Sequence, residues 1–291
     1  MCSTYDHEQC SERLEGALVV DKADMSGKAD RWANSIDTTR PSIARAYDVV
    51  LRGKDNFEVD RAFVAEIAKV VPEIFDVATY NRQILGRGVR FMSSAGIDQF
   101  LDLGSGLPTI ENTHQVAQRA RPGSRVVYVD NDPMVLAHGR VFLEENDDTA
   151  VVTSDLREPA AILNDEAVRR LIDFDRPVGV MLVGILHHLH DSEDPKGIVE
   201  AYMAAVPPGS HLFITHFCAS SQDSRDAEEK YLALLGTGRF RTPEEITAYF
   251  DGFDLLDPGV VPLPLWRPDT PVQGELTVGH RLMYGGIAKK P

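Results

Sequence analysis

The sequence predicts an α/β protein whose mostly parallel, doubly wound sheet is covered by helices on both faces. Three observations favour this fold class. From residue 97 onward, short apolar stretches typical of buried strands alternate with stretches of helical length. The turn Gly104-Ser105-Gly106 follows the first of these strands, and an acidic residue, Asp130, ends the second. Since a crossover through a helix makes successive strands parallel, the alternation predicts a parallel sheet.

The expected elements follow one another regularly as far as residue 217. Strands are expected at residues 99–103, 125–130, 150–153, 178–183 and 211–217, and helices near 109–120, 132–145, 159–172 and 195–206. Beyond them, Thr242 can cap a new helix and Glu245 can complete a capping box. Strands near 253–261 and 281–288 are joined without a helix, which predicts an antiparallel hairpin at one sheet edge. The sheet would then have seven strands.

The segment before residue 97 predicts a helical cap rather than more of the sheet. Apolar residues recur there at helical spacing in three runs, which Gly53 and Pro72 separate. We therefore expect an N-terminal helical cap at residues 31–96 and the sheet domain at residues 97–291. Nothing in the composition marks a linker between the two, so the cap is expected to pack on the main domain.

The composition argues against several classes of function. The chain has 291 residues and a formal net charge of −15, and no basic cluster offers a face for nucleic acid. No apolar run reaches the roughly 20 residues of a membrane-spanning helix. Three scattered cysteines suit neither a disulfide framework nor a zinc site, which is typical of a cytoplasmic protein. Residues 1–30 are expected to form a disordered leader, with Met25 an alternative start of translation.

Acidic residues stand at the ends of three consecutive predicted strands. Asp102 precedes the glycine turn, Asp130 ends the second strand, and Asp155 follows the third. In open α/β sheets ligands bind outside the carboxyl ends of the strands, so these carboxylates are expected to share one crevice. Asp102 could receive an ammonium group, and Asp130 with Asn131 could accept from ribose hydroxyls. Asp155 could accept from an adenine amino group, although each acid could instead be only a helix cap.

Together these groups predict a cofactor with a charged amino-acid end, a ribose and an adenine. S-adenosylmethionine (SAM) fits this description, and Met134 could pack against its adenine ring. A dinucleotide is disfavoured because Thr109 replaces the third glycine of the dinucleotide fingerprint. Asp102 would also repel a pyrophosphate at this turn.

Around these residues the chain resembles a known family. Residues 98–217 resemble the class I SAM-dependent methyltransferases, and about residues 34–288 are similar to the S-adenosyl methyltransferase family of actinobacteria, long described as a domain of unknown function. The motifs that carry the resemblance are Thr39-Arg40-Pro41-Ser42-Ile43-Ala44-Arg45-Ala46-Tyr47-Asp48, Leu51-Arg52-Gly53-Lys54-Asp55-Asn56-Phe57, Asn81-Arg82, Leu107-Pro108-Thr109 after the Asp102 turn, and Val129-Asp130-Asn131-Asp132-Pro133. The chain departs from the family at Arg52-Gly53, where a Gly-Gly pair is frequent. The resemblance implies a Rossmann-like class I methyltransferase fold and SAM binding, but no particular acceptor.

The residues and the resemblance together assign the cofactor contacts. These are Tyr47, Lys54, Arg82, Asp102, Gly104, Ser105, Gly106, Asp130, Asn131, Met134, Asp155, Leu156 and Gly184. The polar segment from Tyr47 to Phe57 is expected to act as a lid, whose cation would meet the cofactor carboxylate. Arg82 competes for this role, and a solvated loop with a local ion pair is the alternative.

The stretch from Gly184 to Asp191 follows the fourth strand and would face the methyl group. Methyl transfer needs mainly near-attack positioning, but a hydroxyl or protonated amine acceptor also needs a base. His187 and His188 are the candidate bases, because a histidine titrates near working pH; packing or substrate contact is the alternative. A metal site is not expected, because the spacing of the histidines does not converge on one point. His216 is expected to be a satisfied histidine at the edge of the core.

The predicted function is methyl transfer from SAM to an unidentified small-molecule acceptor in a cytoplasmic enzyme. The alternatives are a SAM-binding regulator without turnover and an NAD-dependent oxidoreductase. A protein acceptor is also open, and the acidic charge would then favour a basic partner. No nucleic-acid or membrane partner is expected, and the sequence leaves the oligomeric state open.

Overall fold

The structure is a computed structural model, and it divides the chain into two units, Met1–Asp37 and Thr38–Pro291. The described residues are 36–108, 111–142 and 146–291, without the side chains of 140–142. The predicted leader at residues 1–30 and the alternative start at Met25 lie outside them. All elements described below, the cap helices included, belong to the second unit.

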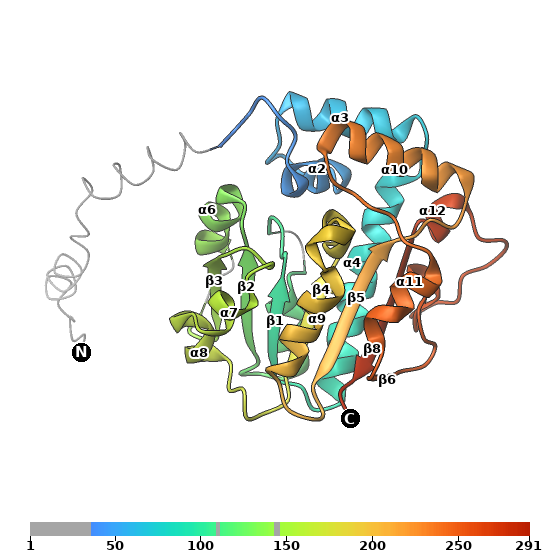
Figure 1. Cartoon of the computed structure of the whole chain (residues 1–291). Helices are drawn as coiled ribbons and strands as arrows, with labels where there is room; N and C mark the ends of the chain where they lie inside the picture. The colour runs from blue at the N-terminus through green and yellow to red at the C-terminus, as the bar shows by residue number, and fades with distance from the viewer. Residues whose placement is uncertain (1–35, 109–110, 143–145) are drawn as a thin grey trace, which may run out of the picture. The chain divides into compact units, whose positions relative to one another are not determined.

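In the described residues, eight strands form one sheet in the order β3-β2-β1-β4-β5-β8-β6, and β7 also pairs with β8 (Figure 1). The strands are β1 (Gln99–Leu103), β2 (Arg125–Asp130), β3 (Thr149–Thr153), β4 (Gly179–Val183), β5 (His211–Phe217), β6 (Asp254–Leu255), β7 (Val261–Pro262) and β8 (Met283–Lys289). The first five strands are parallel to one another, and β8 runs antiparallel to β5. The predicted mostly parallel sheet with an antiparallel edge is confirmed.

This edge differs in detail from the predicted hairpin. The segment expected as one strand at residues 253–261 forms two short strands, β6 and β7, with a turn at residues 257–258 between them. Both pair with β8, at different points: Leu255 lies opposite Ala288, and Val261 lies opposite Gly285. The described sheet therefore has eight strands rather than seven, because the apolar pattern of this segment does not reveal the turn that divides it.

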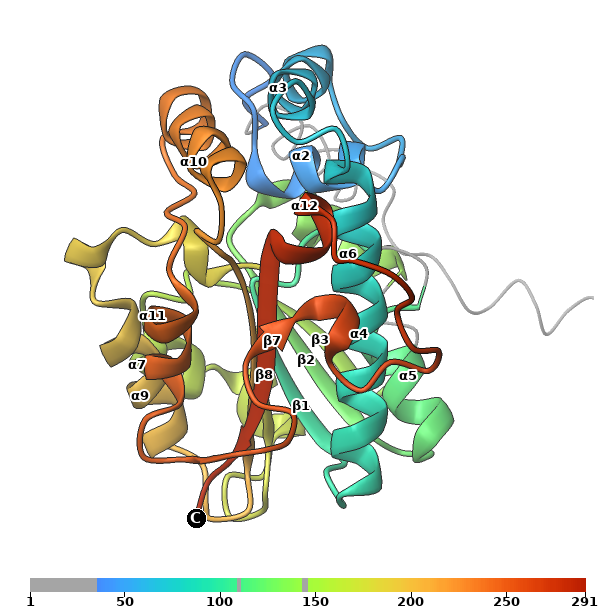
Figure 2. The same ribbon diagram turned by 90° about the vertical axis from the view of Figure 1, so that its right-hand side faces the viewer.

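Helices cover both faces of the sheet, as a doubly wound fold requires. α4 (Ile74–Ser94) and α5 (Thr113–Ala120) lie on one face, and α7 (Pro159–Leu163) and α9 (Pro195–Ala204) lie on the other (Figure 2). The remaining helices of four or more residues are α2 (Ile43–Val50), α3 (Glu58–Ala68), α6 (Pro133–Phe142), α8 (Glu166–Leu171), α10 (Gln222–Leu235), α11 (Pro243–Thr247) and α12 (Val278–Arg281). Successive side chains of β1 enter opposite cores, Phe100 on the α4 side and Leu101 on the other.

α11 begins where the sequence predicts. The backbone N–H of Thr242 donates to the Glu245 carboxylate at 2.7 Å, and the N–H of Glu245 donates to the Thr242 hydroxyl at 3.3 Å. This is the expected capping box. Among the described helices, none combines the length and the apolar character that crossing a bilayer requires.

Of the three described helices that fall in the expected cap, α2 and α3 lie beyond the carboxyl ends of the parallel strands, whereas α4 covers one face of the sheet (Figure 1 and Figure 2). α2 and α3 are found beyond these strand ends together with α10, a helix that the sequence pattern does not predict (Figure 1). The buried side chains of α10 are Ser224, Ala227 and Tyr231. Three buried positions, one of them a serine, are too few to give an apolar period that stands out in the sequence.

A buried ion pair connects the two shorter cap helices. Nε of Arg45 on α2 donates to the carboxylate of Asp60 on α3 at 2.8 Å, and these side chains are 4% and 0% exposed. The Asp60 carboxylate also accepts from the backbone N–H groups of Ser42 and Phe57. The hydroxyl of Ser42 donates to Asp132 at the start of α6. Ser42 and Arg45, which belong to a motif that carries the family resemblance, therefore hold α2 in place against α3 and α6.

Candidate functional site

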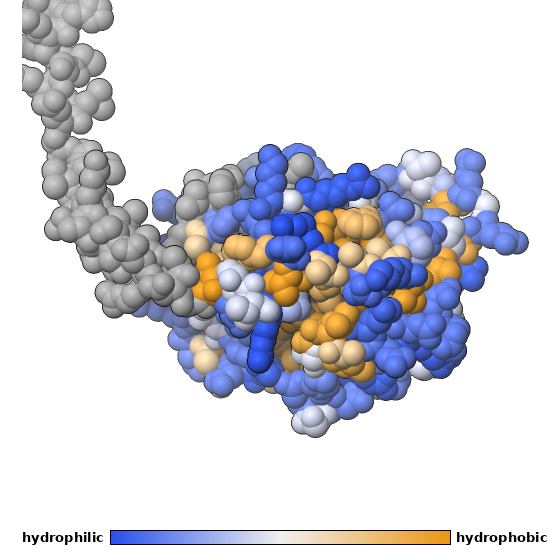
Figure 3. Space-filling model, turned by 90° about the horizontal axis from the view of Figure 1, so that it is seen from above, coloured by the Kyte–Doolittle hydropathy of each residue, from blue (hydrophilic) through white to orange (hydrophobic). Residues whose placement is uncertain are grey.

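A cavity of about 520 Å³ lies at the carboxyl ends of the parallel strands. The loops after β1, β2 and β4 line it together with α2, α3, α4 and α10. Seen from above, apolar side chains gather near the middle of this face and hydrophilic ones surround them (Figure 3). The volume is within the range of about 300–1,000 Å³ that is typical of small-molecule sites. One end of the cavity is polar and the other is apolar.

The polar end begins at the glycine turn after β1. Gly104 and Gly106 have φ of +73° and +68°, a region that side-chain-bearing residues rarely adopt. A Cβ atom on Gly104 would lie 2.4 Å from the side chain of Ile185, so the turn packs tightly against the loop after β4. A Cβ atom on Gly106 would meet nothing within 4 Å. The backbone at Gly106 therefore leaves open space for a ligand.

Asp102 lies at the inner side of this turn and is only 4% exposed. Its carboxylate accepts a hydrogen bond of 2.7 Å from the hydroxyl of Thr113. Burial raises the pKa of the Asp102 carboxyl to about 6, although the Thr113 hydrogen bond and the charge of Arg82 act in the opposite direction. A cation placed beside this carboxylate would stabilise its ionised form.

Asp130 ends β2 and holds the glycine turn in place. One of its carboxylate oxygens accepts from the backbone N–H of Gly106 at 2.8 Å, and the other accepts from that of Asp132 at 2.9 Å. Burial raises the pKa of this carboxyl to about 6. An ionised carboxylate has about four acceptor positions, so Asp130 retains capacity for the hydroxyls of a ligand.

The hydroxyl of Ser105 lines the cavity, is buried, and has no hydrogen-bond partner in the part of the chain that the structure describes. A buried hydroxyl without a partner costs about 1–3 kcal/mol, which a ligand atom beside it would recover. The carboxylates of Asp102 and Asp130 supply acceptors for an ammonium group and for ribose hydroxyls. The polar end therefore fits the amino-acid and ribose parts of the predicted cofactor.

Two residues of α2 and α4 complete the polar end. The hydroxyl of Tyr47 accepts from the amide nitrogen of Asn81 at 3.0 Å, and the amide oxygen of Asn81 accepts from Thr215 at 2.7 Å. A Cβ atom on Gly184 would lie 3.1 Å from this amide nitrogen, so the loop after β4 passes close to Asn81. Arg82 lines the cavity beside them. Asn81 belongs to a motif of the resemblance but was not among the predicted site residues.

The other end of the cavity is apolar. Its lining comes from α2, α3, α10 and the facing ends of β5 and β8, and includes Val50, Phe63, Val64, Phe217, Tyr231, Leu235 and Met283. Ring centroids of Phe63 and Tyr231 are 5.2 Å apart, and those of Tyr231 and Phe217 are 5.3 Å apart. None of these residues was among the predicted site residues, because apolar positions on helices and strands are usually core positions.

The loop after β4 connects the two ends. Its Ile185 packs on Gly104, and the ring centroid of His187 lies 4.3 Å from that of Phe217. The backbone N–H of Phe217 donates to Nδ1 of His187 at 3.4 Å. Nδ1 is therefore the unprotonated nitrogen, and Nε2 of the neutral ring carries the hydrogen. With one nitrogen accepting and the other protonated, His187 is not placed to act as a base.

His188 lines the cavity with a free ring nitrogen. Its Nδ1 lies 3.0 Å from the hydroxyl of Thr237, and within the described residues Nε2 has no hydrogen-bond partner. Burial lowers the pKa of His188 to about 3, and it lowers that of His187 well below the usual value. The premise that these histidines titrate near working pH is wrong, because their burial disfavours the charged ring.

Comparison with known proteins identifies the family. The model of the family described as S-adenosyl methyltransferase matches residues 29–291. The chain belongs to this family. The structure is similar to that of a putative methyltransferase from Thermobifida fusca, with 50% identity and a TM-score of 0.85 over 87% of this chain and 96% of that one. A DUF574 family protein from Streptomyces avermitilis is 35% identical, with a TM-score of 0.84 over 88% of this chain and 99% of that one. Among proteins with curated descriptions, none matches.

This chain is thus a SAM-dependent methyltransferase with a class I, Rossmann-like fold, and its cofactor is SAM. The predicted family, fold class and cofactor are confirmed. The methyl acceptor is not identified by the family.

The structure brings most of the predicted cofactor residues of this methyltransferase together. Those that line the cavity are Tyr47, Arg82, Asp102, Gly104, Ser105, Gly106, Asp130, Asn131 and Gly184. Lys54, Met134, Asp155 and Leu156 are not among the lining residues. Met134 is buried, at 7% exposure.

Lys54 is exposed in a loop that Asp48 holds. The Asp48 carboxylate accepts from the backbone N–H of Asp55 at 2.9 Å and from the side-chain amide of Asn56 at 2.8 Å. These hydrogen bonds fix the loop without any contribution from Lys54. Of the two cations considered for the cofactor carboxylate, Arg82 lines the cavity and Lys54 does not.

Asp155 is engaged by a neighbouring arginine instead of facing the cavity. Its carboxylate accepts from Nε of Arg157 at 2.9 Å, and Arg157 also donates to Glu193 at 2.6 Å. The hydrogen bond from Arg157 lowers the pKa of Asp155. The carbonyl of Leu156 accepts from the Tyr202 hydroxyl at 2.8 Å. The adenine contacts expected of Asp155 and Leu156 are therefore not prepared in this structure.

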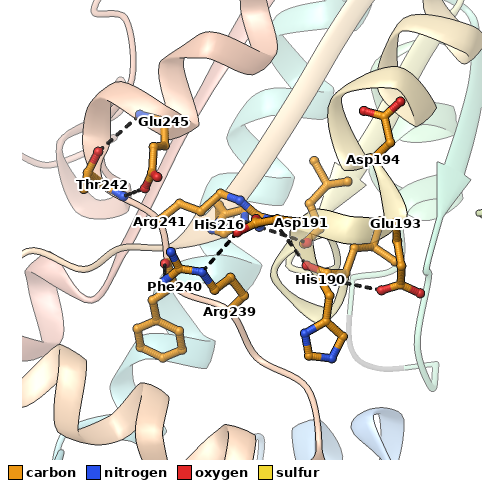
Figure 4. A network of polar contacts seen from close by, with 12 residues as sticks. His190, Asp191, Glu193, Asp194, His216, Arg239, Phe240, Arg241, Thr242 and Glu245 are labelled. Carbon is orange, nitrogen blue, oxygen red and sulfur yellow. Dashed lines mark hydrogen bonds and ion pairs between the residues drawn. The ribbon is translucent and has the colours of Figure 1, made fainter.

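Arg241 holds in place the loop after β4 at residues 184–191, which we call the histidine loop. Its guanidinium donates to Asp191 at 2.7 Å, to the carbonyl of Leu189 at 3.3 Å and to Nε2 of His216 at 2.9 Å (Figure 4). His216 is fully buried, and its Nδ1 pairs with the carbonyl of Phe217, so the prediction of a satisfied histidine is confirmed. Within the described ranges, no three His, Cys, Asp or Glu side chains gather as metal ligands would.

The two glycines of the turn offer a matched test of its packing. Gly104→Ala should lower the free energy of unfolding by about 2–3 kcal/mol, because the new methyl group adds a collision with Ile185 to the backbone strain of positive φ. Gly106→Ala adds only the strain, which is worth about 1–2 kcal/mol. Urea unfolding followed by circular dichroism measures both. Equal losses in the two variants would contradict the packing described here.

Proposed function

We propose that this methyltransferase transfers the methyl group of SAM to a small molecule that binds in the apolar end of the cavity. The observation that carries the proposal is the single cavity with two chemically different ends. The polar end offers carboxylates and a free hydroxyl, and the apolar end has no charged side chain among its described lining residues. SAM supplies an electrophilic methyl group when bound, and an acceptor in the apolar end would approach that group across the histidine loop.

The residues of the polar end act by positioning. Asp102 receives the ammonium group of the cofactor, Arg82 meets its carboxylate, and Asp130 accepts from the ribose hydroxyls, with Ser105 as a further contact. Such fixed placement of two reactants accounts for most of the rate that a methyltransferase needs. Adenine contacts from Met134, Asp155 or Leu156 stay predictions.

The proposed role of His188 follows from its free nitrogen rather than from titration. A hydroxyl becomes strongly acidic as its oxygen gains a methyl group, so even a weakly basic imidazole can take the proton at that moment. His187, whose protonated Nε2 can only donate, would contact the acceptor or keep the loop in place. His188 is thus the better candidate of the predicted pair.

Calorimetric titration separates the candidate functions. The protein should bind SAM and S-adenosylhomocysteine with micromolar dissociation constants and should not bind NAD. Binding of NAD alone would return the chain to the oxidoreductase alternative. A SAM-binding regulator would bind the same two ligands. It would differ from the enzyme because, when it is saturated with SAM, the apolar end of its cavity would have no affinity for an acceptor.

The affinity for SAM should fall as the pH drops below about 6, the value to which burial raises the pKa of the Asp102 carboxyl. Only the ionised carboxyl attracts the ammonium group, and at pH 5 about a tenth of it is ionised, so protonation of Asp102 alone should weaken SAM binding about tenfold relative to pH 7. Burial also raises the pKa of the Asp130 carboxyl to about 6, and its protonation adds a loss that any ligand with the same ribose shares. Stability runs the other way. Because the pKa of the Asp102 carboxyl is higher in the folded than in the unfolded chain, its protonation stabilises the ligand-free fold at a pH below the unfolded-state pKa. This contribution to the free energy of unfolding is lost as the pH rises through about 6.

The matched ligand for this test is 5′-methylthioadenosine, which lacks the amino-acid end. Its affinity should change less between pH 7 and pH 5 than that of SAM. The variant Asp102→Asn should reduce the pH dependence of SAM binding to that of 5′-methylthioadenosine, because Asp130 still titrates in this range. An equal fall for both ligands would show that Asp102 does not receive the ammonium group.

We also place the enzyme in the cytoplasm, on its cysteine usage. Cys218 is buried and unpaired, and burial raises the pKa of its thiol to about 12, so the thiol stays protonated. Reduced, unpaired cysteines are the rule in that compartment. A nucleic-acid partner is not proposed, because a net charge of −15 would repel phosphates.

A further inference from the structure

The charged side chains that line the cavity all lie around its polar end. They are Arg82, Asp102, Asp130 and Asp132. The described lining residues of the apolar end include no Asp, Glu, Lys or Arg. A carboxylate, phosphate or ammonium group placed there would lose its hydration without gaining a counter-charge, which is unfavourable. The apolar end therefore selects against charged acceptors.

A continuous row of rings forms one side of the apolar end. Phe63, Tyr231 and Phe217 follow one another at centroid distances of 5.2 and 5.3 Å. His187 lies 4.3 Å from Phe217, and His188 lies 4.4 Å from His187. These five residues, which we call the aromatic wall, come from α3, α10, β5 and the loop after β4, and all line the cavity. Rings of this kind favour planar aromatic ligands through stacked or edge-to-face contacts.

The aromatic wall carries polar atoms on Tyr231, His187 and His188, and that of His188 is suited to accept from a neutral ligand. Nδ1 of His188 lies 3.0 Å from the hydroxyl of Thr237, and Nε2 has no hydrogen-bond partner within the described residues. A hydroxyl can donate to this nitrogen, whereas a carboxylate cannot, because it has no hydrogen to offer. We take the tautomer in which Nδ1–H donates to the Thr237 hydroxyl, which leaves Nε2 of His188 as a hydrogen-bond acceptor on the loop that connects both ends of the cavity.

We propose that the acceptor is an uncharged aromatic alcohol whose ring lies on the aromatic wall and whose hydroxyl donates to Nε2 of His188. This inference rests on the proposed function. The hydroxyl oxygen forms the new bond to the methyl carbon. The carbon–sulfur bond breaks with its electron pair going to sulfur, which becomes a neutral thioether. The hydroxyl proton passes to Nε2 of His188 and from there to solvent, so atoms and charge balance.

The test uses four probes that differ in one property each: 2-naphthol, naphthalene, 2-naphthoate and decahydro-2-naphthol. Their affinities are measured by titration into the enzyme saturated with S-adenosylhomocysteine. We expect 2-naphthol to bind at least tenfold more tightly than 2-naphthoate, and more tightly than the ring without a hydroxyl or the saturated alcohol. Equal or tighter binding of 2-naphthoate, or of the saturated alcohol, overturns the proposed class. When SAM replaces S-adenosylhomocysteine, bound 2-naphthol should be converted to its methyl ether. If 2-naphthol binds but no ether forms, the assignment of the hydroxyl as nucleophile is overturned.

Two variants assign the preference to named residues. Leu235 on α10 is half-buried and lines the cavity, so Leu235→Lys should favour 2-naphthoate over 2-naphthol. His188→Leu should remove the preference for 2-naphthol over naphthalene and leave the affinity for S-adenosylhomocysteine unchanged. A preference that survives His188→Leu shows that another group binds the hydroxyl. Failure of S-adenosylhomocysteine itself to bind would instead overturn the proposed function, so the two failures are distinguishable.

Discussion

Asp60→Ala should lower the free energy of unfolding by about 3–5 kcal/mol, because it leaves the guanidinium of Arg45 buried without its counter-charge. The two side chains are 2.8 Å apart and are 4% and 0% exposed. The variant also removes the acceptor for the backbone N–H groups of Ser42 and Phe57. Urea denaturation followed by circular dichroism measures the loss. The cap helices should lose structure first, since this pair joins α2 to α3.

The exposed ion pair between Arg90 and Asp269 is the matched control. Its nitrogen–oxygen distance is also 2.8 Å, but its side chains are 48% and 76% exposed. Asp269→Ala should therefore cost less than about 1 kcal/mol, because water and salt screen an exposed pair. Comparable losses in the two variants would mean that burial does not determine the strength of the Arg45–Asp60 pair.

The central strands could be predicted from the sequence almost to the residue. β1, β2 and β5 run over residues 99–103, 125–130 and 211–217, as predicted. Strands buried on both faces are short runs of apolar residues with turn residues at their ends, so the pattern is local. β6 and β7 have only two residues each and exist through their pairing with β8. Their positions depend on a distant partner, which no local pattern records.

The polar end of the site was predictable because the backbone determines it. A glycine turn and acids at the tips of parallel strands fall at one edge of the sheet whatever the other side chains do. Two of the four exceptions, Lys54 and Asp155, depend on side-chain partners: Asp48 holds the loop of Lys54, and Arg157 engages Asp155. Spacing along the chain predicts where a residue lies, but not which neighbour its side chain will bind.

The apolar end was not predictable, because core and cavity use the same residue types. Phe63 and Tyr231 look like core positions until α3 and α10 are placed over the sheet. The state of His188 has a similar origin, since burial by elements distant in sequence lowers its pKa to about 3. Histidine identity alone predicts a group that titrates near neutral pH.

Asp130→Ala should weaken the binding of SAM about 100-fold, which corresponds to about 3 kcal/mol. The variant removes charged acceptors for the ribose hydroxyls, worth about 1.5–3 kcal/mol. It also releases the backbone N–H of Gly106, which the carboxylate holds at 2.8 Å, so the turn that faces the cofactor loses its anchor. Calorimetric titration with SAM at pH 7.5 measures the change, and circular dichroism checks that the variant is folded.

Asp155→Ala is the matched control for this prediction, since both acids follow neighbouring strands and both were predicted to contact SAM. Asp155 pairs with Arg157 and does not line the cavity, so its loss should change the affinity for SAM less than about threefold. A large loss in Asp155→Ala would mean that the site closes around adenine when SAM binds, by releasing Asp155 from Arg157. Unchanged affinity in folded Asp130→Ala would remove the ribose assignment, and the cofactor would then have to be held mainly by Asp102, Arg82 and Ser105.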